Sequence, residues 1–230
     1  TTSGVRLGAQ TGQTLTEEDA RAIAVEVPEV QAAAPSLRSS TQLVAGNGNW
    51  ASSVIGTSAE YFEVRDWPLA QGRLFESTEL AGSGKVVILG QTVADQLFPG
   101  MDPVDQVVRV RRVPLTVIGV LERKGQNSTG QDQDDAVFVP ISTYRNRVQG
   151  GGSGRLKRVA AISVKVHDGQ SMKAAEDGIR ELLRQRHRIA LGQDDDFSVR
   201  NLTEMMLAQE EASRVMTLLL AAVAGVSLLV

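Results

Sequence analysis

The sequence predicts an α+β fold: a split α/β domain holds a second, small mixed α/β domain inserted in it and is followed by a stalk helix entering the membrane. Three observations predict this. Similar helix and strand patterns stand on both sides of a middle stretch of short elements, residues 57–154. A glycine-rich connector, residues 150–154, closes that stretch. An uncharged apolar run, residues 215–230, ends the sequence. A discontinuous outer domain with an insertion is the simplest arrangement of these parts.

The first outer part begins with a predicted helix. Thr16 and Asp19 form a pair typical of a capping box, and the apolar residues after them repeat at helical spacing until Pro28 ends the helix. Glycine and asparagine at 46–49 favour a hairpin turn, because such turns need residues that tolerate positive φ. The predicted strands are 30–34, 37–45 and 50–57.

The middle stretch alternates short strands and short helices. A polar loop over residues 123–135 precedes its last strand, which Pro140 closes. The predicted elements are a helical turn at Tyr61 and Phe62, a turn at Gly72 and Arg73, a strand at 85–89, a helix at 91–97, and strands at 107–110, 115–121 and 136–139.

The second outer part returns to the first pattern. A strand is predicted over 159–166, and a helix from Ser171 carries one apolar face. A last strand covers 197–199. Asn201, with Glu204 three residues later, is predicted to cap a helix that continues into the apolar run.

The apolar run is predicted to be most of one membrane span. A span takes about 20 apolar residues, so we expect its remainder beyond residue 230. A buried core helix is the alternative, which the length of the run allows. The span is favoured because all faces of the helix are apolar and the polar turns end abruptly at Arg214. The residues expected to enter the membrane are Val215, Leu218, Leu219, Leu220, Val223, Val226, Leu228 and Leu229.

Composition narrows the classes of function. A formal net charge of −3 and a pI near 5.5 argue against nucleic acid as a partner. The chain has no cysteine, which excludes disulfides, thiolate metal sites and cysteine nucleophiles.

The sequence predicts no catalytic, cofactor or metal site, and therefore no enzyme. The segment ending in Gly84 and Lys85 is not a phosphate loop, because Glu79 and Val86 stand where that motif needs Gly and Ser or Thr. Two aspartate clusters lack the glycine and terminal glutamate of a calcium loop, and solvated turns are the preferred interpretation. They are Asp132, Asp134 and Asp135, and Asp194, Asp195 and Asp196. The two histidines, His167 and His187, are predicted to be surface residues at the ends of elements.

Two groups of basic residues have more than one possible function. They could form a docking surface for an acidic partner or lipid headgroups, but a solvated strand edge that discourages aggregation is favoured. The groups are Arg109, Arg111 and Arg112, and Arg155, Lys157 and Arg158.

An ordered series of segments resembles a known family. The segments are GTSAEYFEV at 56–64, QGRLF at 71–75, VVILG at 86–90 with LFP at 97–99, VIGVL at 117–121, VFVPIST at 137–143 and ISVKV at 162–166. In this order and spacing they are similar to the periplasmic core domain of MacB-like ABC transporter permeases, within the MacB/FtsX-type permease superfamily. The similarity covers nearly the whole chain.

The resemblance implies a porter-like α/β domain formed by residues 1–56 and 155–200, an inserted small α/β (Sabre-like) domain at 57–154, and a stalk and truncated transmembrane helix at 201–230. It implies an extracytoplasmic domain, on the periplasmic side of the inner membrane, that transmits ATP-driven conformational change for export of drugs, peptides or lipoproteins, without chemistry of its own. The implied partners are the inner membrane, a second copy in a homodimer, a cytoplasmic ATP-binding domain or subunit, and a periplasmic adaptor protein.

Three alternatives stay open. A ligand-sensing ectodomain of a membrane receptor would also join an α/β domain to a stalk helix. A membrane-tethered hydrolase would need an acid, base or nucleophile constellation in a pocket. Within the transporter class, lipoprotein-releasing and cell-division-type permeases remain alternatives to efflux.

Overall fold

The computed structural model describes residues 4–9, 14–127, 130–150, 157–201 and 217. The strands are β1 (Gly4–Ala9), β2 (Val30–Ala45), β3 (Gly48–Thr57), β4 (Leu69–Gly72), β5 (Val86–Leu89), β6 (Val107–Val110), β7 (Val113–Leu121), β8 (Ala136–Pro140), β9 (Ala161–Val166) and β10 (Phe197–Asn201). The helices are α1 (Glu17–Glu26), α2 (Glu60–Val64), α3 (Ser77–Gly82), α4 (Gln91–Leu97), α5 (Ile141–Thr143), the π-helix η1 (Tyr144–Val148) and α6 (Met172–Arg186).

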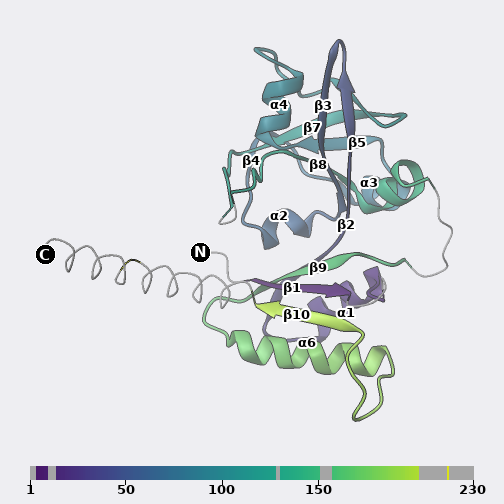
Figure 1. Cartoon of the computed structure of the whole chain (residues 1–230), viewed down its shortest axis with the longest axis vertical. Helices are drawn as coiled ribbons and strands as arrows, with labels where there is room; N and C mark the ends of the chain where they lie inside the picture. The colour runs from purple at the N-terminus through teal and green to yellow at the C-terminus, as the bar shows by residue number, and fades with distance from the viewer. Residues whose placement is uncertain (1–3, 10–13, 128–129, 151–156, 202–216, 218–230) are drawn as a thin grey trace, which may run out of the picture.

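The described strands form one ten-stranded mixed sheet in the order β10-β1-β9-β2-β3-β8-β5-β7-β4, with β6 pairing β2 and β7 beside this path. Figure 1 shows two parts of this sheet. We call the part with β1, β9, β10, α1 and α6 the base, and the part with residues 48–148 the head. The β2 strand, 16 residues long, belongs to both. Its first half pairs β9, and its second half pairs β3 and β6.

The β2 strand corrects the prediction of two separate strands. Pro35 lies inside it and pairs Ile162 of β9. Proline lacks an N–H and is tolerated in a strand where no ladder bond is needed. The pairing of β2 with β3 ends at Ser36 and Thr57. No β3 residue is therefore paired with Pro35, and no β3 carbonyl lacks a hydrogen bond because Pro35 has no N–H. The carbonyl of Pro35 instead accepts a hydrogen bond from Thr57 Oγ1 at 2.8 Å.

Several predicted elements are confirmed. Helix α1 has Thr16 as its N-cap, and both hydrogen bonds of the capping box with Asp19 are present. The turn at Gly46 and Asn47 joins β2 to β3, with Gly46 at a φ of 53°. Helix α4 and strand β6 have the predicted bounds. The short elements β1, α3 and η1 were not predicted.

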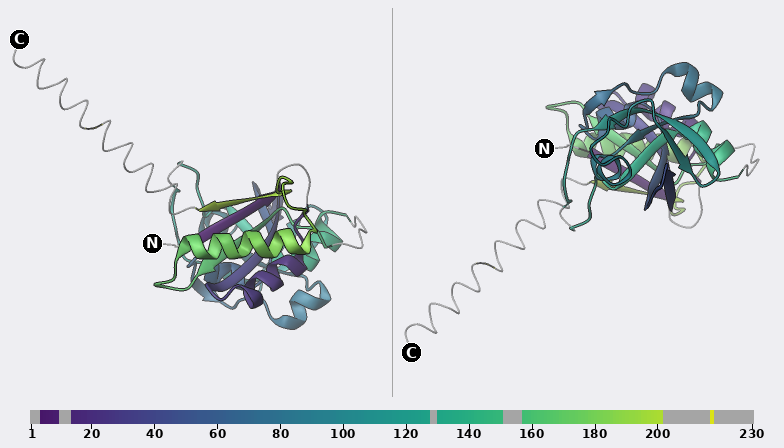
Figure 2. Two further views of the ribbon diagram at one scale, coloured as in Figure 1. Left: turned by 90° about the horizontal axis from the view of Figure 1, so that it is seen from below. Right: turned by 90° about the horizontal axis from the view of Figure 1, so that it is seen from above.

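The core has two clusters on opposite faces of the sheet. The larger one joins base and head, because residues of α1 and α6 such as Ile23 and Ile179 share it with Leu115 and Val139 of the head. Helix α6 crosses the sheet face of the base (Figure 2). The smaller one packs α2 and its aromatic neighbours against the sheet. The predicted division into domains at residues 56 and 155 stays a prediction, and sheet pairing between β3 and β8 crosses it.

The predicted stalk and the eight residues expected to enter the membrane lie outside the described residues, and so does most of the glycine connector. Asn201 ends β10 and pairs Val5. Among the described residues, no helix is both long and apolar enough to cross a bilayer.

Candidate functional site

The first candidate feature is one end of the strands of the base, where Gly4 and Asn201, the outermost residues of β1 and β10, lie. Gly4 of β1 pairs Lys165 of β9, and Val5 pairs Asn201 of β10. Val166, the last residue of β9, pairs Val30 of β2. We call these neighbouring strand ends, taken together, the terminal edge (Figure 1). Because β1 and β10 are antiparallel, the chain enters and leaves the base at the same place. A force applied to both segments there would act on one point of the sheet.

The second feature is the junction of head and base at α2. The side chains of Phe62 and Trp67 share a buried cluster with Ala32 and Ala34 of β2. The small alanine side chains let the aromatic rings approach the sheet closely. Phe138 of β8 lies at the centre of this cluster, with its ring centroid 5.4 to 5.6 Å from those of three neighbouring aromatic residues.

Polar contacts support the same junction. Lys165 of β9 forms an ion pair at 2.5 Å with Asp66, directly after α2. Gln31 of β2 donates a hydrogen bond at 2.9 Å to Glu63 of α2. These contacts are exposed and contribute little free energy each, so the apolar cluster carries most of the stability of the junction.

His187 is the third feature, and it corrects the prediction of a surface histidine. It ends α6 as predicted, but its side chain is only 11% exposed. Its Nδ1 lies 2.8 Å from a carboxylate oxygen of Asp196, and its Nε2 lies 3.3 Å from Asp19. Arg186 Nε donates to the other oxygen of Asp19 at 2.7 Å. This ionic cluster joins the start of α1, the end of α6 and the residue before β10.

The pKa values of the cluster follow from these contacts. Burial alone would lower the pKa of His187, but hydrogen bonds to Asp196 and Asp19 outweigh it and raise the pKa above 6.5. Burial would raise the pKa of Asp19, yet hydrogen bonds from Arg186, Thr16 and His187 leave it below 3.8. The imidazolium of His187 and the carboxylate of Asp19 are therefore charged together at weakly acidic pH.

Stability should fall with rising pH through this cluster. The contribution of a raised His187 pKa is complete below about pH 6.5 and is lost as pH rises through the folded-state pKa. The contribution of Asp19 is present above its ordinary pKa and is lost only as pH falls through its lowered value. We expect urea unfolding of H187Q to give a flatter stability profile than the wild type between about pH 6 and pH 9.

His167 supplies the matched control, because it is exposed directly after β9. H167Q should keep the profile of the wild type. A wild-type slope retained in H187Q would show that another group titrates.

The aspartate cluster at 132–135 departs from the predicted solvated turn. Asp134 is 1% exposed, and its two carboxylate oxygens accept the backbone N–H groups of Lys124 and Gly125, each at 2.8 Å. Asp132 accepts from Thr92 Oγ1 at 2.7 Å, and Asp135 accepts from Trp50 Nε1 at 2.9 Å. Each carboxylate therefore fixes a different piece of the head. Among the described residues, no group of His, Asp or Glu has the arrangement of a metal site.

The second aspartate cluster is engaged as well. Asp195 forms ion pairs with Arg180 and Arg184, and Asp196 contacts His187. Asp194 is exposed. These residues hold the segment before β10 against α6. No local sequence signal indicates these ion pairs, because the two arginines lie on a separate element.

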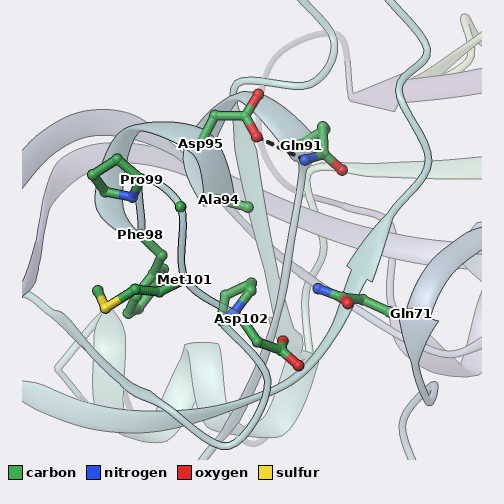
Figure 3. A pocket seen from close by; sticks show the side chains of 10 residues that line it. Gln71, Gln91, Ala94, Asp95, Phe98, Pro99, Met101 and Asp102 are labelled. Carbon is green, nitrogen blue, oxygen red and sulfur yellow. Dashed lines mark hydrogen bonds between the residues drawn. The ribbon is translucent and has the colours of Figure 1, made fainter.

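A groove of about 420 Å³ lies in the head beside α4 (Figure 3). Gln71 of β4 points toward Asp102 across it, and the ring of Phe98 forms part of its floor. The titratable groups in its lining are Asp95 and Asp102. Asp95 is engaged by Gln91 at 2.8 Å and by Arg123. The groove thus holds no pairing of a nucleophile with a base.

A family model described as the MacB-like periplasmic core domain matches residues 1–182. The chain belongs to this family. The resemblance found in the sequence is therefore confirmed.

Curated relatives agree with the family. A protein of Syntrophobacter fumaroxidans named macrolide export ATP-binding/permease protein MacB is 34% identical over 99% of this chain and 39% of its own length. Proteins of the same name from Azoarcus sp. and Rhodospirillum rubrum are 39% and 40% identical over 97% and 96% of this chain. The chain spans about a third of the length of these two relatives, 32% of each.

Solved structures share the fold. The periplasmic region of MacB from Actinobacillus actinomycetemcomitans superimposes with a TM-score of 0.74 at 26% identity, covering 91% of this chain and 93% of that one. The extracellular domain of the ABC-type transporter YknZ from Gram-positive bacteria gives a TM-score of 0.68 at 18% identity, covering 86% and 100%. The mixed α/β architecture is thus that of a MacB periplasmic region.

Proposed function

We propose that this chain is the extracytoplasmic domain of an ABC transporter permease at the inner membrane, and that it passes ATP-driven movement from the membrane to periplasmic surfaces. The relatives are named export ATP-binding/permease proteins. In the proposed assembly, an ATP-binding domain or subunit outside this chain supplies the energy, a second copy completes a homodimer, and a periplasmic adaptor receives the movement. Drugs, peptides and lipoproteins are the proposed classes of cargo.

The observation that carries the proposal is the continuity of the sheet from the terminal edge to the head. Movement can be transmitted over distance only by parts that do not deform under it. The β2 strand begins at the terminal edge beside Val166 and ends in the head, paired with β6. The larger core cluster includes side chains of both parts. Base and head therefore move as one body when the terminal edge is displaced.

This predicts that a covalent link between head and base leaves transport intact. We would introduce D66C and K165C together in the full-length permease, because these residues already contact each other across the junction and residues 1–230 hold no cysteine. A short thiol-specific bridge between them should leave both ATP hydrolysis and export unchanged. Each single-cysteine variant, treated with the same reagent, controls for modification alone.

A second variant tests the connection to the membrane. Ala208 lies in the predicted stalk helix. Insertion of Pro-Gly after it should leave ATP hydrolysis running while export is lost, because a break in a helix absorbs the movement that the helix would transmit. Loss of export on bridging the junction would overturn the one-body mechanism. Unchanged export with the Pro-Gly insertion would overturn transmission itself.

A further inference from the structure

Basic residues from three separate segments gather around the π-helix η1. Arg111 lies in the turn between β6 and β7, and its Nη1 donates a hydrogen bond at 3.0 Å to the carbonyl of Val148, the last residue of η1. Arg145 of η1 has its Nη2 3.3 Å from the carbonyl of Arg158, which leads into β9. Members of both basic groups noted in the sequence, Arg111 of the first and Arg158 of the second, therefore lie beside one short helix. We call this set the basic cluster: Arg111, Arg112, Arg145, Arg147, Lys157 and Arg158.

Arg109 does not belong to this cluster. Its strand neighbours Val108 and Val110 are buried in the larger core, whereas Arg109 is exposed. Because side chains alternate along a strand, Arg109 points to the opposite face of the sheet. Arg155 lies outside the described residues.

The basic cluster carries a large uncompensated charge. Among the described residues, its ion-pair partner is Glu17, 2.6 Å from Arg145 and 3.9 Å from Lys157. The closer contact is ionic, without hydrogen-bond geometry. Two of the six cations, Arg145 and Lys157, share Glu17 with Arg21 of α1. The other four form no ion pair with a described carboxylate, although the whole chain has a formal net charge of −3. A concentrated positive field on an acidic protein attracts an anionic partner.

Two of the arginines are oriented by neutral groups. Arg111 donates to the carbonyl of Val148 as described above, and Arg147 Nε lies 3.3 Å from the carbonyl of Ser83. Arg145 differs, because it also pairs with Glu17. A carbonyl fixes the guanidinium without cancelling its charge, so the remaining N–H groups stay available in a fixed fork that matches a carboxylate. Tyr144 and Val148, which are 3% and 2% exposed, anchor η1 to the core. Arg111 and Arg147 are therefore held in place before any partner binds.

We propose that the basic cluster binds an acidic segment of a partner protein through its Asp and Glu side chains. The choice of a protein over lipid headgroups rests on the proposed function. Lys157 and Arg158 precede the first residue of β9, whereas its last residue, Val166, lies at the terminal edge. Six strand residues at about 3.3 Å each separate the two ends by more than the Debye length of about 8 Å. The headgroups of a membrane at the terminal edge are thus too far away to bind the basic cluster.

The test measures binding to the full chain of residues 1–230 in detergent, without ATP or other subunits. The probe is a fluorescein-labelled peptide of alternating Glu and Ser, and a peptide of alternating Lys and Ser is its counterpart. We expect fluorescence anisotropy to show binding of the Glu peptide that weakens with added salt, and none of the Lys peptide. R112E/R147E should weaken binding at least about tenfold, since two attractive contacts become repulsive.

The matched control is R38E/R109E, which changes the net charge equally. Both of these arginines are exposed and form no ion pair with a described carboxylate. The control should bind the Glu peptide as the wild type does, with unchanged unfolding temperatures for both variants. Equal loss of binding in the two variants would overturn the site, and so would an absence of binding in the wild type.

Vesicles containing phosphatidylglycerol distinguish the lipid alternative. If they bind the wild type and lose binding with R112E/R147E while the Glu peptide does not bind, the partner is a lipid surface and the proposal fails. These results do not depend on export, so failure here leaves the transmission of movement standing, and failure of the junction experiment leaves this site standing.

Discussion

F138A is expected to lower the free energy of unfolding by about 3 to 5 kcal/mol, the usual cost of deleting a fully buried phenyl ring. Phe138 is 0% exposed in the middle of β8, and its ring centroid lies 5.6 Å from that of Tyr61, 5.4 Å from Phe62 and 5.5 Å from Trp67. The ring fills the space beneath α2, and the packed aromatic neighbours cannot all move inward to close the cavity. Urea unfolding followed by tryptophan fluorescence measures the change.

Two variants control this experiment. F138L retains most of the volume and should cost under about 1.5 kcal/mol. L191A removes an apolar side chain that is fully exposed, so its effect should stay within about 0.5 kcal/mol. A cost for F138A below about 1 kcal/mol would mean that the cavity collapses, and the aromatic cluster would then not be the rigid link between α2 and the sheet.

G90A should be equally severe for a different reason. A Cβ at position 90 would lie 2.2 Å from the carbonyl oxygen of Asp134 and 2.9 Å from that of Ala136. Both atoms belong to the backbone, and Gly90 N–H donates to the Ala136 carbonyl at 2.8 Å, so separating the segments breaks that bond. The hydrogen bonds from Lys124 and Gly125 to Asp134 hold the opposing loop in place. The expected loss is about 3 kcal/mol or more, measured by urea unfolding.

Gly82 gives the matched glycine control. It ends α3 with an ordinary φ, and an added Cβ would meet nothing within 4 Å. Alanine has the higher helix propensity, so G82A should be neutral or stabilise by up to about 1 kcal/mol. If G90A unfolds at the same urea concentration as the wild type, the close approach of the two backbones is not a constraint in solution.

Elements with strong local signals could be predicted from the sequence. The capping box of Thr16 and Asp19 defines the start of α1, and the apolar spacing after Ser171 defines the buried face of α6. These signals depend on residues within one or two turns of each other, which a sequence shows directly. The ordered segments of the family resemblance added the overall architecture.

Features that depend on distant partners could not be predicted. Strand β1 has only six residues and is held by β9 and β10 from the far end of the chain. Asp134 resembles a surface aspartate until the backbone N–H groups that it accepts from are known. His187 needs Asp19, which lies at the start of α1. In each case the partner is remote in sequence, so no local spacing rule signals it.

The basic residues show the same limit for function. The sequence showed two groups of cations but not whether they share a surface. The contacts of Arg111 and Arg145 with the backbone around η1 bring the groups together, while strand alternation removes Arg109. Charge could be counted from the sequence, but its placement required the fold.

The position of β1 between β9 and β10 also orders events during synthesis. All strands and helices of the head come from a contiguous stretch of chain, so the ribosome delivers everything that the head needs before residue 150. Strand β1 cannot pair at that stage, because its neighbours β9 and β10 are translated more than 150 residues later. Non-local pairing of this kind is slow, and until it forms, β1 has unpaired backbone groups along both of its edges. The base can therefore complete its sheet only after β9 and β10 have been synthesised.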